Sequence, residues 1–298
     1  MSRHSPQSRA GYSAARPEGG RAQMETPRQI GILGLGAMGR PMARHLIAKG
    51  FRIAGCDSSV SACERAAALG VVIVGTPREL AARSDAVLIV VGFDAQVERA
   101  TFGANGIREA GRPGLIVAMG STIAPSYARD LAKRLEGSGI VLLDMALTRG
   151  EPFAETGTML ILGGGDDAAF AACQPVFRCF ASDIFHLGPF GAGQVGKMVN
   201  NLILWACMSA NDEGLRLGAA LGVDTEKLRG ALTHSSAENF SLSARADERP
   251  TPWAEKDMRI ALQEAAAAGL SLPLSALVKD RIADFKRRKG YPTPQEDG

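Results

Sequence analysis

The sequence is poor in aromatic residues and in charge of one sign, and it holds no long apolar run. Its 298 residues include 34 basic and 31 acidic side chains, which leaves a formal charge of +3. A charge this small does not argue for binding to nucleic acid or to a membrane surface. No apolar run is long enough to cross a bilayer, so we expect no membrane-spanning helix. The 46% of hydrophobic residues still suffices for a sizeable core in a chain of this length.

Cysteine is also scarce, and its spacing forms no recognisable pattern. None of the five cysteines belongs to a CxxC pair; they are Cys56, Cys63, Cys173, Cys179 and Cys207. An odd number without close pairs argues against a disulfide framework and against a zinc cluster. The four histidines fall in no metal-ligand spacing. We therefore expect no bound metal and a reducing, cytoplasmic location.

The beginning of the chain has almost nothing apolar to bury. It is rich in Arg, Ser, Gly and Pro, which predicts a disordered tail over residues 1–26. A secretory signal would need an apolar stretch, and this segment has none. An Arg- and Ser-rich transit peptide is one alternative, although Pro17 disfavours an amphipathic helix. Another alternative is that Met24 is the natural start.

Short apolar runs alternate with helical stretches from Gln29 onward. The strand-like runs are Gln29–Leu33, Arg52–Cys56, Val71–Val74, Ala86–Val91, Leu115–Met119, Ile140–Ala146 and Met159–Leu162. Helical stretches between them include Met38–Lys49, Ala62–Leu69 and Ser126–Leu135. This alternation predicts an α/β domain over residues 27–188, a doubly wound Rossmann fold whose sheet is mostly parallel.

The pattern changes after Gly188, where every further segment is helical. The expected helices are Gln194–Ala220, Thr225–Thr233, Glu255–Ala268 and Pro273–Arg288. Since no strand-like run follows His186, we expect an all-α domain over residues 189–298. A chain organised in this way would place its active site between the two domains.

Three glycines follow the first expected strand in G-x-G-x-x-G spacing. The turn consists of Gly34, Leu35, Gly36, Ala37, Met38 and Gly39, and a helix begins at its end. The first glycine permits a tight turn, the second lets backbone approach a pyrophosphate, and the third lets the helix pack on the strand. The helix start then binds the anion through free N–H groups. We therefore expect these six residues to bind a dinucleotide.

A carboxylate stands where the adenosine ribose of such a cofactor would lie. Asp57 ends the second expected strand, 23 positions after Gly34. A carboxylate there binds ribose hydroxyls and repels the extra phosphate of NADP, so NAD is favoured over NADP. The alternative is that Asp57 only caps the next helix. Val91 and Gly92, at the end of the strand expected over Ala86–Val91, are assigned to the cofactor site as well.

The longer run around the glycine turn, GLGAMGRPMA over residues 34–43, resembles the β-hydroxyacid dehydrogenase family. That family includes 3-hydroxyisobutyrate dehydrogenase and tartronate semialdehyde reductase and is related to 6-phosphogluconate dehydrogenase. Further blocks match in the same order, so the resemblance extends from Gln29 to Phe285. It implies an NAD-dependent oxidoreductase that interconverts a short β-hydroxy acid and its semialdehyde or keto acid. It also implies a homodimer or homotetramer.

Two of these blocks concern the nicotinamide and the substrate. The run STIAP over residues 121–125 is similar to a family turn whose threonine, here Thr122, lies near the nicotinamide. The run DMALTRG over residues 144–150 resembles the family's substrate loop, which implies that Thr148 and Gly150 hold the substrate carboxylate. Arg149 stands where the family has a glycine. Either it binds an additional anionic group of the substrate, or it points to solvent.

A further block, GPFGAGQVGKMVNN over residues 188–201, resembles the family's catalytic signature. It places Lys197 and Asn201 four positions apart, so they share one face of a helix close to its start. The positive end of the helix and partial burial both favour a neutral lysine, which can take the hydroxyl proton. Asn201 would hydrogen-bond the substrate. In the run WAEKDM over residues 253–258, Lys256 matches a lysine that reaches the cofactor in the family.

Two other functions remain as alternatives. Imine reductases look similar overall but typically lack the lysine that Lys197 matches. A non-catalytic dinucleotide-binding scaffold or sensor would keep the fold and lose the same lysine. Because Lys197 and Asn201 are both present, the sequence favours the dehydrogenase.

Overall fold

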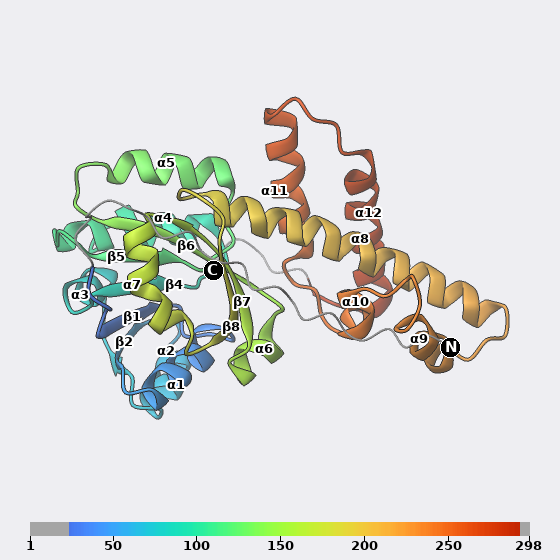
Figure 1. Cartoon of the computed structure of the whole chain (residues 1–298), viewed down its shortest axis with the longest axis horizontal. Coiled ribbons are helices and arrows are strands. Elements are labelled where there is room, and N and C mark those ends of the chain that lie inside the picture. Colours follow the sequence, from blue (N-terminus) through green and yellow to red (C-terminus); the bar gives the residue numbers. More distant parts are fainter. Residues whose placement is uncertain (1–23, 293–298) are drawn as a thin grey trace, which may run out of the picture.

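The structure is a computed structural model that describes residues 24–292 of the chain. Most of the tail expected over residues 1–26 lies outside the described residues. An α/β lobe comes first in the sequence, and a helical part extends away from it along one long helix (Figure 1). Among the described residues, none of the helices combines the length and the apolar character that crossing a membrane requires.

The α/β lobe is built on an eight-stranded sheet. Its strands are β1 (Gln29–Leu33), β2 (Arg52–Cys56), β3 (Val72–Ile73), β4 (Ala86–Ile89), β5 (Ile116–Met119), β6 (Val141–Thr148), β7 (Met159–Gly165) and β8 (Ala181–His186). They lie in the order β3-β2-β1-β4-β5-β6-β7-β8, and every described pair is parallel except β6 with β7. The mostly parallel sheet is therefore confirmed. The strand order reverses direction between β1 and β4, which is where such sheets bind ligands at the carboxyl ends of the strands.

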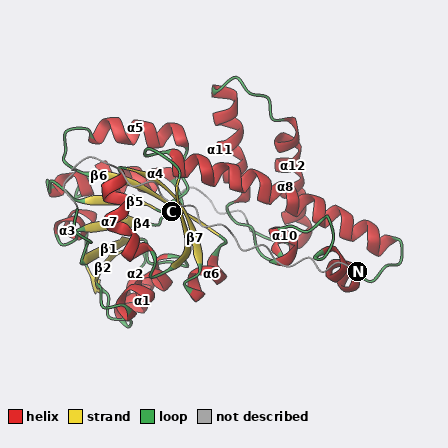
Figure 2. Cartoon of the chain, viewed as in Figure 1, coloured by secondary structure: helices red, strands yellow, loops and turns green. Residues whose placement is uncertain are grey.

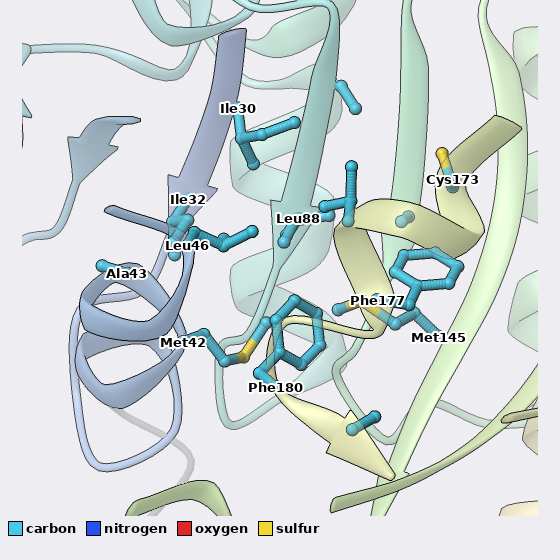
Figure 3. Close-up of a cluster of buried hydrophobic side chains, with 14 of the residues drawn as sticks. Ile30, Ile32, Met42, Ala43, Leu46, Leu88, Met145, Cys173, Phe177 and Phe180 are labelled. Atoms are coloured by element: carbon cyan, nitrogen blue, oxygen red, sulfur yellow. The ribbon is translucent and has the colours of Figure 1, made fainter. Parts of the chain in front are cut away.

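Helices cover both faces of this sheet. They are α1 (Gly39–Ala48), α2 (Val60–Ala67), α3 (Pro77–Ala82), α4 (Asp94–Phe102), η1 (Ile107–Ala110), α5 (Pro125–Leu135), α6 (Glu151–Thr156) and α7 (Asp167–Phe177). Successive strand residues face opposite sides. In β4, Leu88 joins one core cluster while Val87 and Ile89 join the other. Figure 3 shows the first cluster, in which Met42 of α1 and Phe177 of α7 pack around the strands.

The helical part follows the last strand. It comprises α8 (Ala192–Ala220), α9 (Thr225–Leu232), α10 (Phe240–Ser243), η2 (Ala246–Glu248), α11 (Ala254–Ala267) and α12 (Pro273–Lys289). No strand interrupts it in the part of the chain described up to residue 292, as the colours of Figure 2 make plain. A third core cluster joins α8, α11 and α12 through Met208, Met258 and Phe285. The expected all-helical C-terminal region is therefore confirmed.

The structure contains every element that the sequence analysis expected, together with further helices and one further strand. All seven expected strands and all seven expected helices are present, with ends shifted by a few residues. The structure adds β8, the 11-residue helix α7 and several shorter helices, among them α3, α4, α6 and α10. Segments of four to nine residues carry too little periodic pattern to be told from loops, which is why sequence analysis missed the shorter elements.

Candidate active site

The glycine turn between β1 and α1 has one glycine that faces open space. Gly34 has a φ of +97°, and a Cβ on it would lie 2.4 Å from the carbonyl oxygen of Val90. A Cβ on Gly39 would lie 1.9 Å from the carbonyl oxygen of Gly34. A Cβ on Gly36 would meet no atom within 4 Å. The fold thus requires Gly34 and Gly39, whereas Gly36 keeps a space free beside a helix start, as a pyrophosphate needs.

Asp57 lies beside this turn and not in the position of a helix cap. Its Oδ2 accepts a hydrogen bond from the amide of Leu35 at 2.6 Å, and its Oδ1 accepts one from the amide of Ser59 at 2.8 Å. The residue that caps α2 is Ser59, whose side chain accepts from the amide of Ala62. The alternative that Asp57 only caps the next helix is therefore wrong, because Ser59 is the cap and the Asp57 carboxylate is bonded to the glycine turn.

The remaining residues expected at the cofactor meet at the ends of β4 and β5. The amide of Val91 donates to Oγ of Ser121 at 2.8 Å. Lys256, which comes from α11, donates from Nζ to the carbonyl oxygens of Gly92 and Thr122 at 3.1 and 3.0 Å. The helical part therefore closes over the same edge of the sheet that carries the glycine turn.

Lys197 and Asn201 form a second group with an acid on α11. Nδ2 of the buried Asn201 donates to Oδ2 of the buried Asp257 at 2.7 Å. Nζ of Lys256 lies 3.9 Å from Oδ1 of the same carboxylate. The half-buried Lys197 lies on the same face of α8 as Asn201, one turn closer to the helix start.

The surroundings favour the neutral form of Lys197. Burial lowers the pKa of Lys197, the charge of Lys256 lowers it further, and Asp257 opposes both. Burial raises the pKa of Asp257, against the effect of Lys256 and Lys197. A lysine whose pKa is lowered can accept a proton under milder conditions than a surface lysine can.

The start of α8 is held by two buried polar residues, Asp144 and Gln194, to which the sequence analysis assigned no role. Oδ2 of Asp144 in β6 accepts hydrogen bonds from the amides of Gly191 and Gly193 at 2.6 and 2.9 Å. Gln194 donates to the carbonyl oxygen of Ser121 at 3.1 Å and accepts from the amide of Ile123 at 3.1 Å. The helix that carries Lys197 is thus bonded to the middle of β6 and to the segment that follows β5. The sequence signal for Asp144 was an acid inside an otherwise apolar strand.

In the expected substrate loop, polar groups of Thr148 and Arg149 bond to neighbouring protein groups. Thr148 is buried, and its hydroxyl donates to the carbonyl oxygen of Leu160 at 3.2 Å. Arg149 has a φ of +77°, the backbone region that favours the glycine found here in the family. Its guanidinium donates to Ser182 Oγ at 2.9 Å and to Asp183 Oδ2 at 2.7 Å. Gly150, with a φ of +87°, is the residue that precedes α6. The guanidinium therefore points to β8 and shares its charge with a carboxylate.

Comparison with known proteins covers most of the chain. Residues 29–188 match the NAD-binding domain of 6-phosphogluconate dehydrogenase, and residues 191–294 match the NAD-binding domain of NADP-dependent 3-hydroxyisobutyrate dehydrogenase. L-threonate dehydrogenase of Cupriavidus necator is 33% identical over 259 residues, which cover 84% of this chain and 87% of that protein. For 2-(hydroxymethyl)glutarate dehydrogenase of Eubacterium barkeri the identity is 30% over 264 residues, or 85% and 88% of the two chains.

A solved structure agrees with these relatives. That of 3-hydroxyisobutyrate dehydrogenase from Mycobacterium tuberculosis superposes with a TM-score of 0.78 at 29% identity, covering 89% of this chain and 94% of that one. The fold and the glycine turn define an NAD(P)-dependent oxidoreductase. Within that class, the chain belongs to the β-hydroxyacid dehydrogenase family, as its motifs indicated.

Proposed function

We propose that this protein is an NAD-dependent dehydrogenase that interconverts a short β-hydroxy acid and its semialdehyde or keto acid. The observation that carries the proposal is the placement of Lys197, a lysine with a lowered pKa, among Asn201, Asp257 and Lys256. Lys256 in turn is bonded to the strand ends expected at the cofactor. A proton-accepting amine therefore lies close to the edge of the sheet where a dinucleotide would bind.

The residues at this edge fit a bound dinucleotide. Gly36 leaves room for the pyrophosphate, and the Asp57 carboxylate beside Leu35 suits ribose hydroxyls. The negative charge of Asp57 supports a preference for NAD, because it would repel a 2′-phosphate. When bound, the cofactor supplies hydride transfer to or from the substrate carbon.

Residues of the chain transfer the proton and orient the substrate. In oxidation, neutral Lys197 takes the hydroxyl proton, and in reduction the ammonium returns it. Asn201, held by Asp257, has its orientation set before substrate binds. We propose that Gly150 of the β6–α6 loop and Asn201 receive the substrate carboxylate, joined by Thr148 when its hydroxyl turns from the carbonyl oxygen of Leu160 to the substrate. A small anionic hydroxy acid is the class of substrate that these groups would select.

A turnover assay tests the proposal. The purified protein is offered a panel of short hydroxy acids with NAD⁺ or NADP⁺, and the reduced cofactor is followed by absorbance. We expect turnover with NAD⁺ and a loss of about 10²–10⁴-fold in kcat for Lys197→Ala, the usual contribution of a general acid or base. Lys227→Ala, which removes an exposed lysine from α9, is the matched control and should leave kcat unchanged. Unchanged catalysis by Lys197→Ala would refute the assigned role.

The same assay separates the alternatives. Turnover of cyclic imines with none of any hydroxy acid would favour an imine reductase, and cofactor binding without any turnover would favour a sensor. The presence of Lys197 supports the dehydrogenase over both. A homodimer or homotetramer and a cytoplasmic location remain predictions from the sequence.

A further inference from the structure

The start of α8 is held by a single buried carboxylate. Asp144 is fully buried in β6, and its Oδ2 accepts from the amides of Gly191 and Gly193. A Cβ on Gly193 would lie 2.5 Å from Cβ of Asp144 and 2.5 Å from the carbonyl oxygen of Leu162. The first turn of α8 is therefore pressed directly against β6 and β7. Both short bonds and close packing fix its position.

Within residues 24–292, no cation pairs with this carboxylate. The groups that act on it are the amides of Gly191, Gly193 and Gln194 and the side chain of Gln194. Its other oxygen, Oδ1, has no hydrogen-bond partner among the described residues. Burial of an acid without an ion pair is costly. A buried polar atom without a partner calls for an explanation, and a role in the geometry of the site is one.

Lys197 follows Gly193 by four positions and so lies on the same face of α8, about one turn further on. A shift of Gly193 is therefore passed to Lys197 almost unchanged. We propose that Asp144 is a positioning residue whose two hydrogen bonds to the start of α8 set the place of the Lys197 amine. The inference rests on the proposed role of Lys197 in proton transfer.

Substitution of Asp144 tests the inference. Asp144→Ala removes the acceptor, and we expect kcat to fall about 10²-fold, as misplacement of a catalytic group by roughly 1 Å costs. Asp144→Asn keeps an oxygen that can accept from both amides, so kcat should stay within about threefold of the native value. The matched control is Asp166→Ala, which removes a carboxylate that accepts from the amides of Ala168 and Ala169 at the start of α7. It should leave kcat unchanged.

The pH dependence of oxidation separates positioning from a general loss of stability. We expect the rate to rise with pH as Lys197 becomes neutral, and to do so at a lower pH than for an exposed lysine because burial lowers the pKa of Lys197. In Asp144→Ala the amine gains water, so this rise should move to higher pH, whereas in Asp144→Asn and Asp166→Ala it should not move. A variant that is only less stable would keep the rise in place.

Three results would overturn the inference. The first is native kcat and an unmoved pH profile in Asp144→Ala. The second is a kcat in Asp144→Asn as low as in Asp144→Ala, because the acceptor would then be irrelevant. If Asp144→Ala does not fold, a loss of more than about tenfold in Asp144→Asn, which keeps the acceptor, would overturn it. Failure of the proposed function is a separate result, since it requires an active Lys197→Ala enzyme.

Discussion

Gly36 and Gly39 lie in one turn, yet a methyl group has a different consequence at each. Gly36→Ala fills open space, so the protein should fold with an unchanged melting temperature while its affinity for NAD falls by about tenfold or more. Gly39→Ala places a methyl group against the carbonyl oxygen of Gly34 and should destabilise the fold by roughly 1–3 kcal/mol. Thermal unfolding and calorimetric titration with NAD⁺ measure the two effects.

Gly214→Ala is the matched control for these two substitutions. A Cβ on Gly214, in the middle of α8, would meet no atom within 4 Å. The Gly214→Ala substitution should raise the free energy of unfolding slightly, because alanine is the better helix former, and should leave NAD affinity unchanged. Equal losses of NAD affinity and stability at Gly36 and Gly39 would contradict the assignment of the open space to a phosphate.

At the residue scale, the sequence predicted what local spacing determines. The glycine turn and the pair Lys197 and Asn201 are spaced along single segments, so the motifs could single them out as candidate site residues. The partners of Arg149 could not be identified, because Asp183 is 34 positions away and reaches Arg149 only through the pairing of β7 with β8. Gln194 was missed for the same reason, since its partners lie more than 70 positions earlier.

At the element scale, the buried carboxyl of Asp144, which holds the start of α8, makes the stability of the protein depend on pH. Burial raises the pKa of Asp144 from 3.8 to about 6. A carboxyl whose pKa is raised by folding contributes its full stabilisation below pH 3.8, and that contribution is lost as the pH rises through about 6. Two pKa units correspond to about 3 kcal/mol.

Between roughly pH 4 and pH 7, we therefore expect the free energy of unfolding of the native protein to fall by about 3 kcal/mol relative to that of Asp144→Asn. The variant serves as the reference because asparagine does not titrate. Urea unfolding of both proteins at a series of pH values measures this difference in free energy of unfolding. A difference that stays constant across the series would show that Asp144 titrates normally in the folded state.

The order of long elements was predictable, whereas their direction was not. Buried strands alternating with helices indicate a parallel sheet, and β1 to β6 form one. The antiparallel β7 reads as an apolar run like the others, since strand direction leaves no trace in composition. The short connection through the six-residue helix α6 is the physical reason for the reversal, because a parallel crossover needs a dozen or more residues.

At the scale of the whole molecule, contacts from α10 and α11 join the helical part to the α/β lobe. Lys256 of α11 bonds the ends of β4 and β5, and Phe240 of α10 lies against Phe153 of α6 with ring centroids 5.9 Å apart. Oε1 of Glu264 also accepts from the amide of Ser126 at the start of α5, at 2.9 Å. These contacts set the spacing of the parts around the candidate site.

Lys256→Ala tests the first of these contacts. The substitution removes two bonds from a charged donor to carbonyl oxygens, each worth about 1.5–3 kcal/mol. We expect the dissociation constant for NAD to rise about tenfold and the thermal stabilisation by saturating NAD to shrink accordingly. Lys279→Ala, at an exposed position of α12, is the control. Native NAD affinity in Lys256→Ala would show that this contact does not shape the cofactor site.

Because the start of α8 is held in place, a tilt of the helix moves residues near its start much less than residues near its far end. A tilt about Gly191 displaces each residue in proportion to its distance from that point, at 1.5 Å per residue. Lys197 lies six positions from Gly191 and Ala220 lies 29, so the amine moves about one fifth as far as the tip. A displacement caused by a substitution or a binding event near α9 should therefore be much smaller at the Lys197 amine. The outer helices can then vary in sequence with little effect on the position of the amine.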